Sequence, residues 1–157
     1  MTLAPRIQAA SGWVATLVLA GALTPSSSAT QAPGTISQGA LEAIARLECR
    51  FAVRVSVSWL NNQPTVTVRE RAGQLALDIS EINTLDGTAT ATDGPRPMAL
   101  SARSDRSNLY FMEVRRDEVV VSTTVFSQET EPGRLKAVHT RSGPNPEQFY
   151  GECRVVR

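Results

Sequence analysis

The chain contains a single histidine, His139, so any mechanism that pairs a serine or cysteine nucleophile with a histidine base must use it. His139 shares the parity of Leu135 and Ala137 in a short alternating segment, which places it on the inner face of a strand. Neither a Gly-x-Ser-x-Gly elbow nor a Ser-x-x-Lys motif accompanies it. A core-edge histidine bonded to a backbone carbonyl is therefore favoured over a general base or a ligand contact.

Other chemical signals are equally sparse. The sequence holds no glycine-rich phosphate loop, no calcium loop and no metal-ligand spacing, and no carboxylate pair can be placed close together from the sequence. We therefore predict no catalytic residue, no metal site and no cofactor, and a protein that is not an enzyme. Trp59 and Tyr110 join His139 as candidates for ligand binding, although aromatic side chains more often fill a core.

The first part of the chain has the pattern of a secretory signal peptide. Arg6 precedes an apolar run from Trp13 to Leu23, and small residues lead to Ala29. The run is too short to cross a bilayer as a helix, and an N-terminal anchor or a buried helix is the alternative. We expect residues 1–29 to be a signal peptide and the mature protein to be periplasmic or secreted.

The charge of the mature chain gives no argument for a polyanionic partner. The full chain has 16 basic and 15 acidic residues, and removing Arg6 with the signal peptide leaves 15 of each. A neutral chain offers no electrostatic case for binding nucleic acid or anionic lipid. No other apolar stretch is long enough to span a membrane, so we expect no membrane span in the mature chain.

The two cysteines, Cys49 and Cys153, allow one intramolecular pairing. Because exported proteins mature in oxidising compartments, we predict a disulfide between them. Two free thiols or an intermolecular bridge are the alternatives. The bridge would join the first and last predicted strands, since a disulfide needs Cα atoms within roughly 7 Å.

The strongest structural signal is the alternation from Leu47 to Trp59, where apolar residues occupy the odd positions. It predicts a half-buried strand with Arg50 and Arg54 on its outer face. A straight strand of this length exceeds a small domain, so it must coil or bend. A turn at 61–64 and a strand over 65–70 follow, with Val66 and Val68 expected to point inward.

The remaining candidate strands are short and separated by turn-rich breaks, which is typical of an all-β domain. They run over 75–82, 88–92, 97–103, 108–115, 119–126, 135–141 and 148–156. Residues 30–46 read as a linker with a short helix that has Leu41, Ile44 and Ala45 on one face, and 47–157 as the β-domain. We predict a small antiparallel up-and-down barrel of about eight strands closed by the first-to-last disulfide, with a β-sandwich as the alternative.

Four segments carry a resemblance to a known group. Leu47-Glu48-Cys49-Arg50-Phe51, Thr123-Thr124-Val125-Phe126, Ala137-Val138-His139 and Tyr150-Gly151-Glu152-Cys153 resemble the uncharacterised exported single-disulfide β-proteins of high-GC proteobacteria. The resemblance covers about Leu47 to Cys153 and implies no particular activity. In size and closure the domain is also similar to lipocalin-like barrels, but the Gly-x-Trp motif near their first strand is absent.

Two functions of different classes follow from this architecture. Small inward residues such as Ala89, Ala91 and Ala137 either leave a cavity for a small apolar ligand or let the sheet coil tightly. A tightly packed interior would instead favour a protein-interaction module, such as an inhibitor or an envelope accessory factor, since a rigid sheet can present exposed segments to a partner. An enzyme that uses His139 is the third hypothesis.

Overall fold

The computed structural model describes residues 34–93, 97–115 and 119–157, all of which belong to one compact unit. The predicted signal peptide at 1–29 and the beginning of the predicted linker lie outside these residues.

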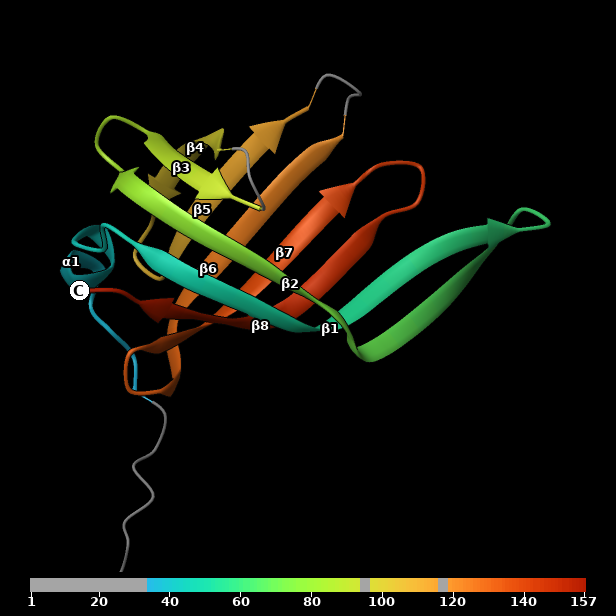
Figure 1. Cartoon of the computed structure of the whole chain (residues 1–157), viewed down its shortest axis with the longest axis horizontal. Helices are drawn as coiled ribbons and strands as arrows, with labels where there is room; N and C mark the ends of the chain where they lie inside the picture. The colour runs from blue at the N-terminus through green and yellow to red at the C-terminus, as the bar shows by residue number, and fades with distance from the viewer. Residues whose placement is uncertain (1–33, 94–96, 116–118) are drawn as a thin grey trace, which may run out of the picture. The chain divides into compact units, whose positions relative to one another are not determined.

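The described chain forms a closed antiparallel barrel (Figure 1). Each strand pairs with the next along the chain, and the last strand pairs with the first. The predicted up-and-down barrel is thus confirmed over the β-sandwich. Its elements are α1 (Gln38–Glu42), β1 (Leu47–Leu60), β2 (Gln63–Asn83), β3 (Thr88–Thr92), β4 (Pro97–Ser104), β5 (Asn108–Val114), β6 (Val120–Glu131), β7 (Arg134–Ser142) and β8 (Glu147–Val155).

The core lies inside the barrel and continues beneath α1. In β6, buried residues alternate with partly exposed ones, as expected for a strand with one face inward. Helix α1 begins after Ser37, whose hydroxyl accepts a hydrogen bond from the Ala40 N–H at 3.3 Å. Leu41 and Ile44 close this end of the barrel and are almost completely buried, whereas Ala45, expected on the same face, is exposed.

The predicted disulfide is present. Cys49 in β1 and Cys153 in β8 lie directly opposite each other on the inner face, with their Cα atoms 3.9 Å apart. Both side chains are fully buried. The bridge therefore joins the two strands whose pairing closes the barrel, across a sequence separation of 104 residues.

Reduction of this disulfide should lower the free energy of unfolding by about 4 kcal/mol, because the bridge restricts a long loop in the unfolded chain. Urea unfolding with and without reductant measures the effect. The double variant Cys49→Ala/Cys153→Ala is the control, since its stability should not respond to reductant. An unchanged wild-type midpoint after verified reduction would contradict the prediction.

A β-bulge at Ala52 interrupts the alternation of β1. Phe51 pairs with Gly151 of β8, but Val53 pairs with Tyr150, so one residue of β1 has no counterpart. Because paired residues share a face, the residues of β1 change faces at this point. Arg54 lies opposite the buried Phe149 on the inner side, whereas the valines that follow Ala52 lie on the outer side.

The prediction that every odd residue from Leu47 to Trp59 faces the core is therefore wrong beyond Phe51. The prediction that Arg50 and Arg54 share the outer face is wrong for the same reason. Arg50 stays outside, 3.7 Å from Asp78, and Arg54 turns to the inner side. A bulge adds one residue without changing the sequence pattern, so parity alone could not locate it.

Gly151 makes room for this bulge. A Cβ atom at residue 151 would lie 2.1 Å from the carbonyl oxygen of Arg50 and 2.6 Å from the Cα of Phe51. Both neighbours are backbone atoms of the bulged strand and have little freedom to move away. Only glycine allows β1 and β8 to approach this closely.

Gly151→Ala should destabilise the barrel by about 3 kcal/mol, since the added methyl group forces apart two strands held by the disulfide. Thermal or urea unfolding measures the loss. Gly143→Ala is the matched control, because its Cβ would meet Val119 Cγ2 at an ordinary 3.5 Å. Equal stability of the two variants would show that the close approach is unimportant.

Strand β2 is continuous where a turn was predicted between two strands. Phe51 pairs with Leu75 and Val53 with Glu70, so residues 71–74 form an irregular stretch within β2. Before this stretch, residues 63–70 of β2 pair with β1 alone. The pairs of β2 with β3 begin only at Asp78. Val66 and Val68, predicted to point inward, are instead 62% and 60% exposed.

Candidate functional site

A two-stranded ribbon extends from one end of the barrel (Figure 1). We define the ribbon as residues 53–60 of β1 and 63–70 of β2, joined by Asn61 and Asn62. Both turn residues have positive φ, 50° and 60°, as in the two-residue turns that suit a twisted hairpin. Strand β8 begins opposite Ser56, so the outer half of the ribbon has no third strand.

One face of the ribbon is apolar and open to solvent. The pairs Val55–Val68, Val57–Val66 and Trp59–Pro64 stand on it, and Val53–Glu70 lies at its base. Trp59 is 61% exposed, similar to Val66 and Val68, and Tyr150 of β8 extends the surface next to Val53. We call the set Val53, Val55, Val57, Trp59, Pro64, Val66 and Val68 the apolar face.

The opposite face is mainly polar and continues into the open end of the barrel. It carries the hydroxyl pairs Ser56–Thr67 and Ser58–Thr65, with Leu60 at the tip. Arg54 lies at its base, forms an ion pair with Glu147 and stacks over Phe149, with 5.8 Å from its guanidinium carbon to the ring centroid. The ribbon is therefore amphipathic, and its polar face is the one directed toward the barrel interior.

The open end of the barrel holds a layer of balanced charges around His139. Arg141 lies 3.7 Å from Asp93 and, at 5.2 Å, over the Phe149 ring. The Nε of Arg115 lies 3.1 Å from a carboxylate oxygen of Glu113. Each cation thus has an acidic neighbour, and no excess charge is directed into the barrel from these pairs.

His139 is a buried, neutral side chain. Its Nδ1 is 2.9 Å from the Thr123 hydroxyl, and its Nε2 makes no hydrogen bond within the described part of the chain. The expected backbone carbonyl partner is thus replaced by a side chain of the neighbouring strand. Burial, together with the positive charges of Arg141 and Arg115, lowers the pKa of His139 to about 4.

The low pKa of His139 predicts a pH dependence of stability. The unfolded chain binds a proton near pH 6.5 and the folded chain only near pH 4, so acidification favours unfolding across this window. We expect His139 to have little effect on the free energy of unfolding above pH 6.5. Between pH 6.5 and 5, protonation of His139 in the unfolded chain should lower the free energy of unfolding by about 2 kcal/mol.

Urea unfolding of the wild type and of His139→Gln across this range measures the effect. The variant keeps a polar side chain that does not titrate, so its stability should vary less with pH. Parallel pH profiles for the two proteins would contradict the low pKa.

The structure does not bring the three predicted ligand-binding candidates together. His139 lies inside the barrel, Trp59 stands near the tip of the ribbon, and Tyr110 is a partly exposed residue on the outer face of β5. The Tyr110 hydroxyl donates to Asp105 at 2.7 Å, next to the turn before β5. These residues form no common site.

The hollow beside His139 in the barrel interior is small. A hollow of about 20 Å³, lined by His139, Thr123 and Arg141 among others, is the size of a single water molecule. Ala89, Ala91 and Ala137 are buried, so the small inward residues serve a tightly coiled sheet. The hollow gives neither a substrate nor a lipid chain access to His139.

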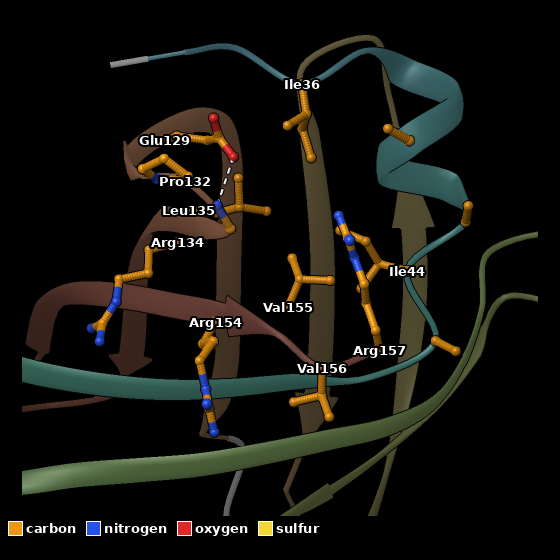
Figure 2. A pocket seen from close by; sticks show the side chains of 14 residues that line it. Ile36, Ile44, Glu129, Pro132, Arg134, Leu135, Arg154, Val155, Val156 and Arg157 are labelled. Atoms are coloured by element: carbon orange, nitrogen blue, oxygen red, sulfur yellow. Dashed lines mark hydrogen bonds between the residues drawn. The ribbon is translucent and has the colours of Figure 1, made fainter. Parts of the chain in front are cut away.

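A larger surface hollow of about 850 Å³ lies at the other end of the barrel, beside α1 (Figure 2). Its apolar lining includes Ile44 and Leu135, which are already buried in the core. Arg134 and Arg154 also line it, but they form ion pairs with Glu152 and Glu48, respectively. These two arginines are thus already paired, whereas Arg157, which also lines the hollow, forms no ion pair with a described residue.

No known family model, curated protein or solved structure matches this chain. The candidate site therefore has to be judged on geometry alone. Across residues 34–93, 97–115 and 119–157, no group of three or more histidine, cysteine or acidic residues is placed to hold a metal ion. The same residues include no helix long and apolar enough to cross a membrane.

The apolar face of the ribbon is the most unusual surface that the structure describes, and sequence reasoning missed it. The alternation of Val66 and Val68 matches that of the other strands and therefore predicts a core position for both. The length of the first predicted strand is the useful signal. A strand of this length is too long for a small barrel, so part of it has to extend beyond the barrel. Asn61-Asn62 as a two-residue turn would have set the register of the ribbon.

Proposed function

We propose that this protein is an exported, non-enzymatic interaction module that binds a protein partner through the apolar face of its ribbon. The barrel then serves as the scaffold that holds the ribbon in position. One observation carries the proposal: the bulge at Ala52 turns the valines of β1 and Trp59 to the outer side, where Trp59, Val66 and Val68 are about three-fifths exposed.

The pattern of the ribbon supports this proposal. Two-stranded ribbons are marginal in water, and a fully solvated one gains nothing from a continuous apolar face. Contiguous exposed apolar surface commonly marks an interaction site. Of the exposed large hydrophobic residues, Trp59, Val66 and Val68 stand together on the apolar face, and Tyr150 borders it.

The interior of the barrel argues against a small ligand held inside it. A drug-sized or lipid ligand needs a pocket of roughly 300–1,000 Å³ lined by accessible apolar groups. The interior hollow is far smaller, at about 20 Å³. The hypothesis that a small apolar ligand is held inside the barrel therefore has no described cavity to support it.

The arrangement around His139 gives no support to enzymatic activity. A histidine base is normally oriented by an acidic or carbonyl partner and faces a nucleophile that substrate can reach. Here its ring contacts Thr123, and the nearby acids are paired with arginines. Its burial beneath the open end leaves room for about one water.

Photo-crosslinking in cells that export the protein tests the proposal. A photoreactive amino acid at residue 66 should give covalent adducts on irradiation, because Val66 stands on the apolar face. The same group at residue 65 is the matched control, since Thr65 is an exposed neighbour on the opposite face. Adducts should be several-fold more abundant from residue 66.

The result that would sink the proposal is the absence of adducts from residue 66, or equal adducts from both positions. Circular dichroism of each purified variant verifies that the barrel is folded, so a negative result refers to binding and not to misfolding.

A further inference from the structure

The charges of the ribbon indicate what kind of partner its apolar face fits. Arg54 and Arg69 lie opposite each other in the strand register, and both belong to the polar face. Among the charged side chains that the structure describes on the ribbon, Glu70 is the one on the side of the apolar pairs, at their base. An anionic membrane would require basic residues beside the inserted apolar groups, so the arrangement does not suit one.

The edge of the ribbon indicates how a partner binds. In a hairpin closed by the Leu60–Gln63 pair, the alternating ladder directs the backbone groups of Pro64, Val66 and Val68 to the free edge of β2. Pro64 has no N–H to donate there, which weakens strand addition along this edge. An added strand would also leave the apolar face uncovered. The partner therefore packs onto the face.

The apolar face is complementary to itself. Trp59 and Pro64 lie at its tip, and Val53 and Glu70 lie at its base, with the valine pairs between them. A twofold axis across the middle of the ribbon superposes the tip of one copy on the base of the other. Valines then meet valines, and Trp59 of each copy lies over the Val53–Glu70 pair of its partner.

Two polar groups at opposite ends of the face fit the same arrangement. The Trp59 indole N–H and the Glu70 carboxylate make no hydrogen bond with the described residues. In the antiparallel packing, the donor at one tip comes close to the acceptor at the other base. The two Glu70 side chains also stay at opposite ends, so like charges do not meet.

The exposed area is sufficient for a weak dimer. With Trp59, Val66 and Val68 about three-fifths exposed and Tyr150 41% exposed, the face offers on the order of 500 Å² per copy. A symmetric pair would bury about 1,000 Å², the lower limit of specific interfaces. Such an area predicts association in the micromolar range.

We infer that the partner of the apolar face is a second copy of this chain, with the two ribbons packed face to face and antiparallel about a twofold axis. The inference rests on the proposed function of the ribbon and specifies its partner.

Sedimentation equilibrium of the purified exported protein tests the inference. The wild type should change from monomer mass to dimer mass as its concentration rises through the micromolar range. Val66→Asp should remain a monomer, because two carboxylates would be buried against valines. Thr65→Asp, which places the same charge on the polar face, should dimerise like the wild type. Each variant is verified by its melting temperature.

Tryptophan fluorescence gives an independent measurement. Trp59 is the only tryptophan outside the predicted signal peptide, so its emission should shift to shorter wavelength as the dimer forms. If Val66→Asp does not fold, Trp59→Gln replaces it, since this exposed tip residue has no role in the barrel core. Its dimer dissociation constant, measured by sedimentation because the variant lacks the fluorophore, should be at least several-fold higher than that of the wild type.

A wild-type protein that remains monomeric up to millimolar concentration would overturn the inference, as would a dimer equally weakened by Thr65→Asp and Val66→Asp. If that monomer still gives residue-66 adducts to another protein in cells, the second copy is refuted but the interaction module stands. If it gives neither dimer nor adduct, both proposals fail.

Discussion

The backbone of Arg50 and Phe51 lies against Gly151 with no space for a side chain between them, and the arrangement of the molecule depends on this approach. It lies where the first and last strands meet, next to the Cys49–Cys153 bridge. Closure at this level requires β1 to accommodate an extra residue at Ala52. That residue exchanges the two faces of the strand, and everything beyond it is reversed relative to the barrel.

The reversal has two consequences on opposite sides of the sheet. On the inner side it delivers Arg54 to Glu147 and to the ring of Phe149, so the open end of the barrel is covered by paired charges and not by apolar side chains. On the outer side it places the partly exposed valines of β1 beside the exposed Val66 and Val68 of β2. The same residues that would have extended the core thus form the surface that we assign to partner binding.

Much of the fold could be predicted from local patterns, because strands and turns are encoded over a few residues. The strand Thr88–Thr92 agrees with the structure to the residue, and two cysteines in a chain expected to be exported predicted the bridge. The faces of the ribbon could not be predicted, because they depend on pairing with β8, a contact between distant parts of the chain. The irregular stretch at 71–74 has the composition of a turn and differs from one only through its partner strand.

The candidate site was harder to predict than the fold for the same reason. The sequence placed His139 on an inner face, but its partner Thr123 comes from a neighbouring strand whose register no local pattern reveals. The exposure of Val66 and Val68 likewise depends on distant parts of the chain, because this part of β2 pairs only with β1. Trp59 was singled out for its aromatic ring, and its importance comes from its position near the tip of the ribbon.

The pairing of Leu47 with Val155 places the start of the first strand beside the end of the last. Two residues further along each strand, the disulfide closes the chain between Cys49 and Cys153 into a covalent ring. A protease that cuts one loop between the two cysteines linearises this ring without releasing a fragment. The barrel can therefore tolerate a cut in a connecting loop while its strands stay tethered. By the same geometry, its ends could be joined and reopened elsewhere, which makes the chain suited to circular permutation.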